Sequence, residues 1–219
     1  DVRFAGSAAY AFVGEDGGVE GSLIGEGNND AIAVRGEHSF VGGTASNFAS
    51  FTVEDGGAAL MGARSEGGSS AGGYSFASVD QLTVQSGGVL YLDRATVLDV
   101  GSYNQEAGGI VEFFLGAPQD FSELTGDVTA GEGDYGRIRV SGIATLNGTV
   151  AGFLDPLFDT ANADLQSVRY EDVIVADGGI NGDFTSVALI ANSSLFEMNS
   201  AVDGNTIRTV GVIGPTRMH

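Results

Sequence analysis

The chain has 219 residues, which is enough for one substantial core or one elongated array of repeats. Its 36 Gly against 3 Pro, together with 42% hydrophobic residues, exclude both a disordered chain and a collagen-like one. The absence of Cys excludes disulfides and thiolate chemistry, and the net charge of -20 makes binding to nucleic acid or to an anionic membrane unfavourable.

Apolar residues alternate with polar ones at strand spacing along most of the chain, and helical periodicity is nearly absent. Four stretches share a pattern of alternating apolar residues, polar residues and a Gly pair: 51–60, 81–92, 105–113 and 173–184. The marker glycines of this pattern are Gly56, Gly87, Gly108 and Gly178, with Gly142 in an equivalent setting. Short strands that recur with Gly turns, without obvious hairpin pairs, predict an all-β solenoid of stacked repeats.

The alternation continues after residue 136. Its apolar residues are predicted to point inward from layer to layer: Val140, Ile143, Leu146 and Val150. Arg137 and Arg139 flank Ile138, so we expect both guanidinium groups to point outward on a solvated strand face.

Three local patterns invite a catalytic or metal-binding interpretation. Residues 68–72 match G-x-S-x-G, but they follow a polar stretch, and His38 and His219 offer no credible base for a triad. Residues 25–33 resemble one nonapeptide calcium repeat with Asp30 in register, yet no second copy follows. A polar turn is the simpler interpretation, so we predict no metal site and no cofactor.

Acidic pairs are the remaining candidates for chemistry. Asp155 with Asp159, and Glu171 with Asp172, provide the two carboxylates that a glycosidase needs. Cleavage of acidic sugars would also need a cationic groove, which a chain without Lys is poorly equipped to form. We therefore predict that the chain is not an enzyme, and keep a β-helical polysaccharide-active enzyme as an alternative.

Three blocks follow one another after Arg137. The first, V-x-G-x-A-x-L-x-G, falls on Val140, Gly142, Ala144, Leu146 and Gly148. The second, Y-x-V-(x)-A-x-G-G-I-x-G-x-F, falls on Tyr170, Val173 or Val175, Ala176, Gly178, Gly179, Ile180, Gly182 and Phe184. The third, D-x-N-x-φ-x-φ, falls on Asp203, Asn205, Ile207, Val210 and Val212. In this order they resemble the C-terminal end of the passenger domains of autotransporters, the type V secretion proteins.

The resemblance implies a right-handed parallel β-helix with a C-terminal antiparallel cap. It divides the chain into β-helical passenger rungs with Gly-rich loops (1–136), an autochaperone-like capping segment (137–212) and the start of a linker (213–219). It also implies secretion through the outer membrane and display at the Gram-negative cell surface. There the parent protein is anchored by its own C-terminal β-barrel translocator, and the chain itself does not insert into a membrane.

The residue types of the three blocks agree with a capping role. Gly178, Gly179 and Gly182 allow a sharp reversal, and Ile180 and Phe184 are suited to plug the end of the core. Asp203, Gly204 and Asn205 form a hairpin-type turn that suits antiparallel strands over an open edge.

The predicted function is therefore that of a structural stalk and a folding and capping segment. The alternative is an adhesin, a virulence function in which irregular loops of the first 75 residues bind a host or neighbouring-cell ligand.

Overall fold

The computed structural model describes residues 2–3, 9–12, 18–19, 22–26, 29–36, 39–41, 44–61, 75–117, 126–155, 165–190 and 197–213. These residues form strands, turns and bends and contain no helix, which confirms the predicted all-β class. The strands belong to two sheets, and almost all of their pairings are parallel.

The larger sheet, called sheet A here, has 14 strands. They are β1 (Val2–Arg3), β2 (Ala9–Phe12), β4 (Leu23–Ile24), β5 (Ala31–Val34), β7 (Ala45–Val53), β9 (Ser75–Val84), β11 (Val97–Gln105), β13 (Gly126–Thr129), β14 (Arg137–Val140), β15 (Ala144–Leu146), β17 (Leu165–Ala176), β18 (Ile180–Gly182), β20 (Glu197–Asp203) and β21 (Thr206–Ile213). Sheet B has 7 strands. They are β3 (Gly18–Val19), β6 (Ser39–Val41), β8 (Ala58–Met61), β10 (Val89–Leu92), β12 (Ile110–Leu115), β16 (Thr149–Leu154) and β19 (Ser186–Ile190).

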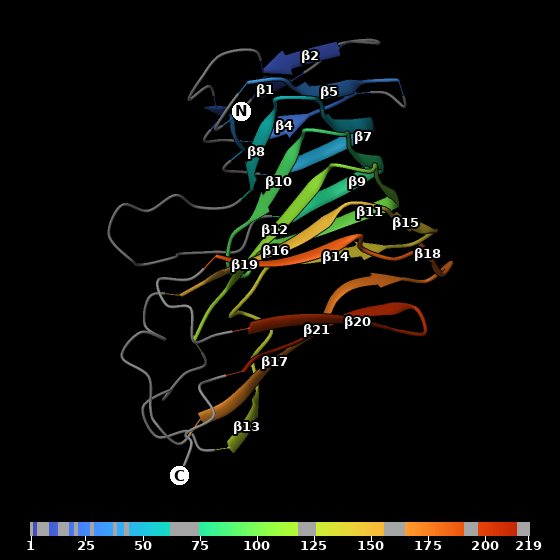
Figure 1. Ribbon diagram of the computed structural model, residues 1–219. Helices are drawn as coiled ribbons and strands as arrows, with labels where there is room; N and C mark the ends of the chain where they lie inside the picture. Colours follow the sequence, from blue (N-terminus) through green and yellow to red (C-terminus); the bar gives the residue numbers. More distant parts are fainter. Residues whose placement is uncertain are drawn as a thin grey trace.

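From β7 to β19 the chain passes alternately through the two sheets. Strand β9 pairs in parallel with β7 and β11, while β10 pairs in parallel with β8 and β12. Each passage through sheet A and then sheet B therefore adds one layer to both sheets, as the colour progression of Figure 1 shows.

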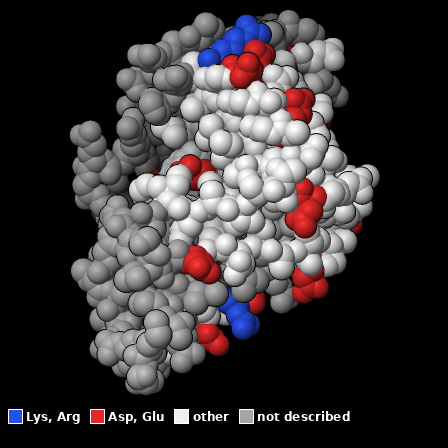
Figure 2. All heavy atoms as spheres, in the orientation of Figure 1, with Lys and Arg blue, Asp and Glu red and all other residues white. Residues whose placement is uncertain are grey.

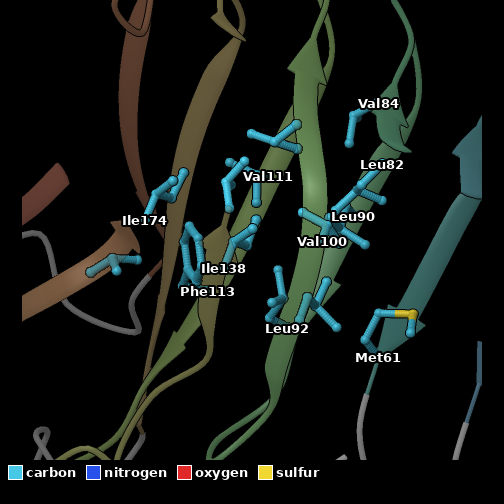
Figure 3. Packing of buried hydrophobic residues seen from close by; sticks show 14 of the residues in the cluster. Met61, Leu82, Val84, Leu90, Leu92, Val100, Val111, Phe113, Ile138 and Ile174 are labelled. Carbon is cyan, nitrogen blue, oxygen red and sulfur yellow. The ribbon is translucent and has the colours of Figure 1, made fainter. Parts of the chain in front are cut away.

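The core lies between the two sheets and is built from columns of aligned apolar side chains (Figure 3). One column runs through sheet B from Ala59 to Leu90, Val111, Val150 and Val187, which are register partners in successive strands. The first four are 0% exposed, whereas Val187, in the last strand of the sheet, is 39% exposed. Alternation of apolar and polar residues explains the column, because every second side chain of a strand points to the same side.

Stacked Gly-Gly turns join sheet A to sheet B. The N–H of Gly56 donates to the carbonyl of Gly87 (3.3 Å), and the N–H of Gly87 donates to that of Gly108 (3.1 Å). All three residues have positive φ, at 74°, 81° and 86°, which explains the need for glycine there. The structure confirms that these three marker glycines are equivalent.

The prediction that Gly142 and Gly178 belong to the same column is wrong. The N–H of Gly142 donates to Gly101 (2.8 Å), and that of Gly178 donates to Gly142 (2.8 Å), so these glycines form a second column at a bend within sheet A. The residue equivalent to the Gly-Gly turns is Gly148, since Thr149 donates to Gly109 across this junction (2.9 Å). The shorter Asn147-Gly148 turn carries no Gly pair and therefore escaped the pattern.

Two side-chain orientations were also predicted wrongly. Ile143 follows the bend at Gly142 and is 48% exposed, because the chain changes direction there between β14 and β15. Arg137 is only 8% exposed and forms an ion pair with Glu132 (3.0 Å), whereas Arg139 is exposed as expected.

Candidate functional site

The hairpin of β20 and β21 forms the C-terminal edge of sheet A. The two strands pair antiparallel around Gly204 (φ 61°) and Asn205, which confirms the hairpin predicted at Asp203 to Asn205. Strand β21 also pairs antiparallel with β17, where Ile207 lies opposite Ile174 and is 1% exposed. Figure 1 shows the hairpin crossing the C-terminal end of the stack.

The hairpin turn is anchored to the last layer by one backbone hydrogen bond and one from a side chain. The N–H of Ala176 donates to the carbonyl of Asn205 (2.9 Å), and the Asn205 amide approaches the carbonyl of Asp177 (3.5 Å). The turn therefore rests on the corner that follows β17. The second and third sequence blocks meet at this corner, although they are separated along the chain.

The other predicted capping residues occupy the two final layers. Val140 and Leu146 are buried, at 3% and 2% exposure. Gly182 (φ 79°) lies over Leu146, and a Cβ there would be 2.4 Å from the Leu146 carbonyl oxygen. At Gly179, φ is 100°.

Ile180 and Phe184 are only partly buried, but both pack against the core. They therefore cover part of the core at this end. Val187, in the last strand of sheet B, remains 39% exposed.

Strand β17 changes partners along its length. Its first half pairs with β13 and its second half with β14, and Asp172, between the halves, has a positive φ of 55°. Glu171 and Asp172, weighed as a carboxylate pair, lie at this irregularity. The strand is thus held by three neighbours, β13, β14 and β21.

Tyr170 in β17 belongs to a tyrosine pair that the sequence did not reveal. Its ring meets that of Tyr135 edge-on, with centroids 5.3 Å apart and planes at 81°. The Tyr170 hydroxyl donates to the carbonyl of Gly116 (2.9 Å), and the Tyr135 hydroxyl donates to that of Glu171. Burial raises the pKa of Tyr135 to about 12 and that of Tyr170 well above its ordinary value, so both hydroxyls remain donors at neutral pH.

Replacing Tyr170 by phenylalanine is expected to lower the free energy of unfolding by about 1–2 kcal/mol, because the carbonyl of Gly116 loses its donor. Tyr103 provides the matched control, since its buried hydroxyl has no hydrogen-bond partner among the described residues. Tyr103→Phe should leave stability unchanged or raise it by up to about 1 kcal/mol. Urea unfolding measures both, and equal effects at the two positions would contradict this account of Tyr170.

A second candidate site is a groove of about 500 Å³ on the outside of sheet A, beside the bend at Gly101. Its exposed polar residues come from four neighbouring segments: Asp80, Asp99, Arg139, Ser141 and Asp177. Val175 of β17 is half-buried beside it, whereas Val79, Val100 and Val140 behind it are buried in the core. Of these polar residues, sequence reasoning had considered only Arg139, because their neighbourhood depends on the register of four layers.

The remaining predicted chemistry has little support. The buried Asp155 carboxylate forms an ion pair with Arg94 (2.9 Å), and Asp159 and residues 68–72 lie outside the described part of the chain. The Asp30 carboxylate is buried and accepts a hydrogen bond from the N–H of Glu26 (2.8 Å), as in a polar turn. Across the described ranges no three His, Cys, Asp or Glu side chains are grouped so that they could hold a metal ion.

The negative charge is dispersed on the face seen in Figure 2, where acidic side chains stand singly or in small groups on a mostly uncharged surface. Within the described residues no helix has the length and apolar character needed to cross a bilayer. Neither a protein-family model nor a curated protein sequence matches the chain.

Proposed function

We propose that the chain is a right-handed parallel β-helix from the secreted passenger of an autotransporter, and that its C-terminal part folds first and caps the stack. The alternation of parallel strands between two sheets supports a solenoid, and a right-handed crossover is the strongly preferred connection between parallel strands. The antiparallel hairpin β20–β21 on β17 carries the capping proposal, because the last parallel strand of sheet A would otherwise offer an unpaired edge.

The arrangement also suits a folding template. In a stack each layer contacts mainly its neighbours, so a stable terminal layer provides the surface on which the preceding layer can form. Strand β17, held by β13, β14 and β21, is such a layer. Residues 137–212 would then act as the autochaperone-like segment, residues 1–136 as rungs added to it, and residues 213–219 as the start of a linker.

In this proposal the stalk is displayed on the Gram-negative cell surface and anchored through the β-barrel of the parent protein. Folding outside the cell buries apolar surface and so disfavours return through the membrane. The high negative charge keeps the emerging chain soluble. The role is structural, and it requires no catalytic residue or cofactor.

The test is surface display of the chain fused to an outer-membrane β-barrel translocator, with and without residues 197–213. Without the hairpin we expect the passenger to reach the surface but to be degraded by added protease at least ten times faster. Gly204→Ala is the control. A Cβ at this position meets no atom within 4 Å, but φ is 61°, so the substitution disfavours only the turn. We expect a rate of degradation between those of the other two proteins. Equal protease resistance with and without the hairpin would refute the capping role.

Adhesion is the second candidate function, and the groove beside Gly101 is the observation that favours it. The loops of the first 75 residues that were expected to bind a ligand lie largely outside the described residues. The groove shifts the candidate binding site from those loops to the side of the stack.

A further inference from the structure

We propose that Asn181, in the last layer of sheet A, is a site of spontaneous deamidation, and that the same dipeptide one layer earlier is protected by the fold. The chain contains Asn-Gly twice, at Asn147-Gly148 and at Asn181-Gly182. In both places a branched aliphatic residue precedes the asparagine, so the two sites have similar intrinsic chemistry. Their surroundings therefore decide which of them reacts. The proposal does not depend on an autotransporter origin.

The reaction needs only the peptide and water. The backbone nitrogen of the residue after the asparagine loses its proton to base and attacks Cγ of the side chain, and a five-membered succinimide forms as ammonia leaves. Water then opens the ring at either carbonyl, which gives aspartate or isoaspartate. A following glycine favours the attack, because it has no Cβ and lets the chain rotate freely. An extended strand does not bring the two atoms together, so the asparagine must leave its ladder before it reacts.

The two asparagines lie at the same corner of neighbouring layers. Leu146 and Gly182 are register partners in β15 and β18, which Figure 1 shows side by side. Asn147 directly follows β15, and Asn181 lies within β18. Both asparagines are exposed, so water and base reach both of them. Exposure therefore does not distinguish the sites, and the difference must come from how firmly each peptide is held.

The peptide after Asn147 is held from both sides. Gly148 is buried, and a Cβ on it would lie 2.1 Å from the carbonyl oxygen of Gly109 in the preceding layer. Its own carbonyl accepts hydrogen bonds from the N–H (2.8 Å) and the hydroxyl (3.0 Å) of Thr185 in the following layer. Strand β15 itself pairs with both β11 and β18. The peptide cannot rotate without displacing a layer on each side.

The peptide after Asn181 is held from one side only. Strand β18 has 3 residues and, among the described strands, pairs with β15 alone. The N–H of Ala144 donates to the carbonyl of Gly179 (3.1 Å), and successive residues of a parallel strand bond in alternate directions. This pattern leaves the N–H of Gly182, the attacking nitrogen, outside the ladder with β15. Gly182 is also exposed, so β18 can open locally by breaking its bonds to one strand.

The products would change the layer on which the hairpin rests. Either product adds a carboxylate two residues before Asp183, and isoaspartate also lengthens the backbone by one carbon within β18. Ile180, which packs against the core at this end, directly precedes the site. We therefore expect the last layer of sheet A to loosen as the protein ages, while the layers before it stay intact.

Peptide mapping by mass spectrometry tests the proposal on the purified 219-residue chain, kept in mildly alkaline buffer and sampled over time. In the folded chain we expect Asn181 to deamidate about tenfold faster than Asn147 or more, because β18 opens more readily than the corner at Gly148. In concentrated urea the two rates should become similar, because neither peptide is held. A difference that persisted unchanged in urea would trace to the local sequence and overturn the proposal.

Asn181→Gln and Asn147→Gln are the matched variants, since glutamine would have to close a larger and less favourable ring. Ageing of the parent chain should speed hydrogen exchange in β18. Asn181→Gln should abolish this change, whereas Asn147→Gln should leave it as it is. Equal rates at the two sites of the folded chain, a faster reaction at Asn147, or no reaction at Asn181 would each overturn the proposal.

Discussion

Gly148→Ala is expected to lower the free energy of unfolding by about 2–4 kcal/mol, the sum of overpacking and lost hydrogen bonds. A Cβ at this position would lie 2.1 Å from the carbonyl oxygen of Gly109 and 2.6 Å from Nε2 of Gln105. That amide is buried and donates to the carbonyls of Gly109 and Thr149, each at 2.9 Å. The new methyl group therefore separates two layers and breaks the side-chain bonds that join them.

Gly133→Ala is the control for this substitution. A Cβ at Gly133 meets no atom within 4 Å, and the residue is not among those with positive φ. Its effect should stay within about 0.5 kcal/mol, as for other surface changes. Chemical denaturation of both variants decides the matter, and a Gly148→Ala protein as stable as Gly133→Ala would show that the layers are not packed as described.

Ile207→Ala is expected to destabilise the chain by about 2–5 kcal/mol, the usual cost of truncating a fully buried side chain. Ile207 of the hairpin belongs to the core, at 1% exposure and opposite Ile174 of β17. Its loss should also weaken the docking of the hairpin on β17, because Ile207 is fully buried whereas Met198 of β20 packs against the core only partly buried. Hydrogen exchange should then speed up first in β20, β21 and the second half of β17.

Val202 offers a control within the same hairpin. It is the cross-strand partner of Ile207 but is 40% exposed, so Val202→Ala should change stability by less than about 0.5 kcal/mol. The two variants change the same element by aliphatic truncation and differ mainly in burial. Similar losses of stability from both variants would mean that the hairpin stabilises the protein through the pairing of β20 with β21 and not through burial of Ile207 in the core.

Local chemistry made much of the fold predictable. Alternation indicated strands, the Gly pairs at 56, 87 and 108 indicated stacked turns, and Asp203 to Asn205 indicated a hairpin. Each of these features is determined by residues close together in the sequence. The assignment of Gly142 and Gly178 failed because a glycine at a bend within a sheet resembles one at a turn between sheets, and only the register of neighbouring layers distinguishes them.

The candidate groove could not have been predicted in the same way. Asp80 and Asp99 are close in sequence, but Arg139 and Asp177 join them only through the lengths of the intervening layers, which are irregular. The burial of Arg137 was missed for another reason, because its ion-pair partner Glu132 is only five residues away, in a turn outside any strand. Tertiary register therefore created the groove from residues that look like ordinary solvated side chains.

The terminal layer closes the two sheets unequally. Sheet A ends in the hairpin, whose outer strand carries Glu197 and Asp203, whereas sheet B ends in β19, which has no charged residue. Val187 continues a column of fully buried residues yet remains 39% exposed. The edge strand of sheet A is therefore protected by charged side chains, whereas the edge strand of sheet B is not. A further β-strand is therefore expected to pair with β19 more readily than with β20, because the exposed Val187 of β19 continues the apolar column of the core.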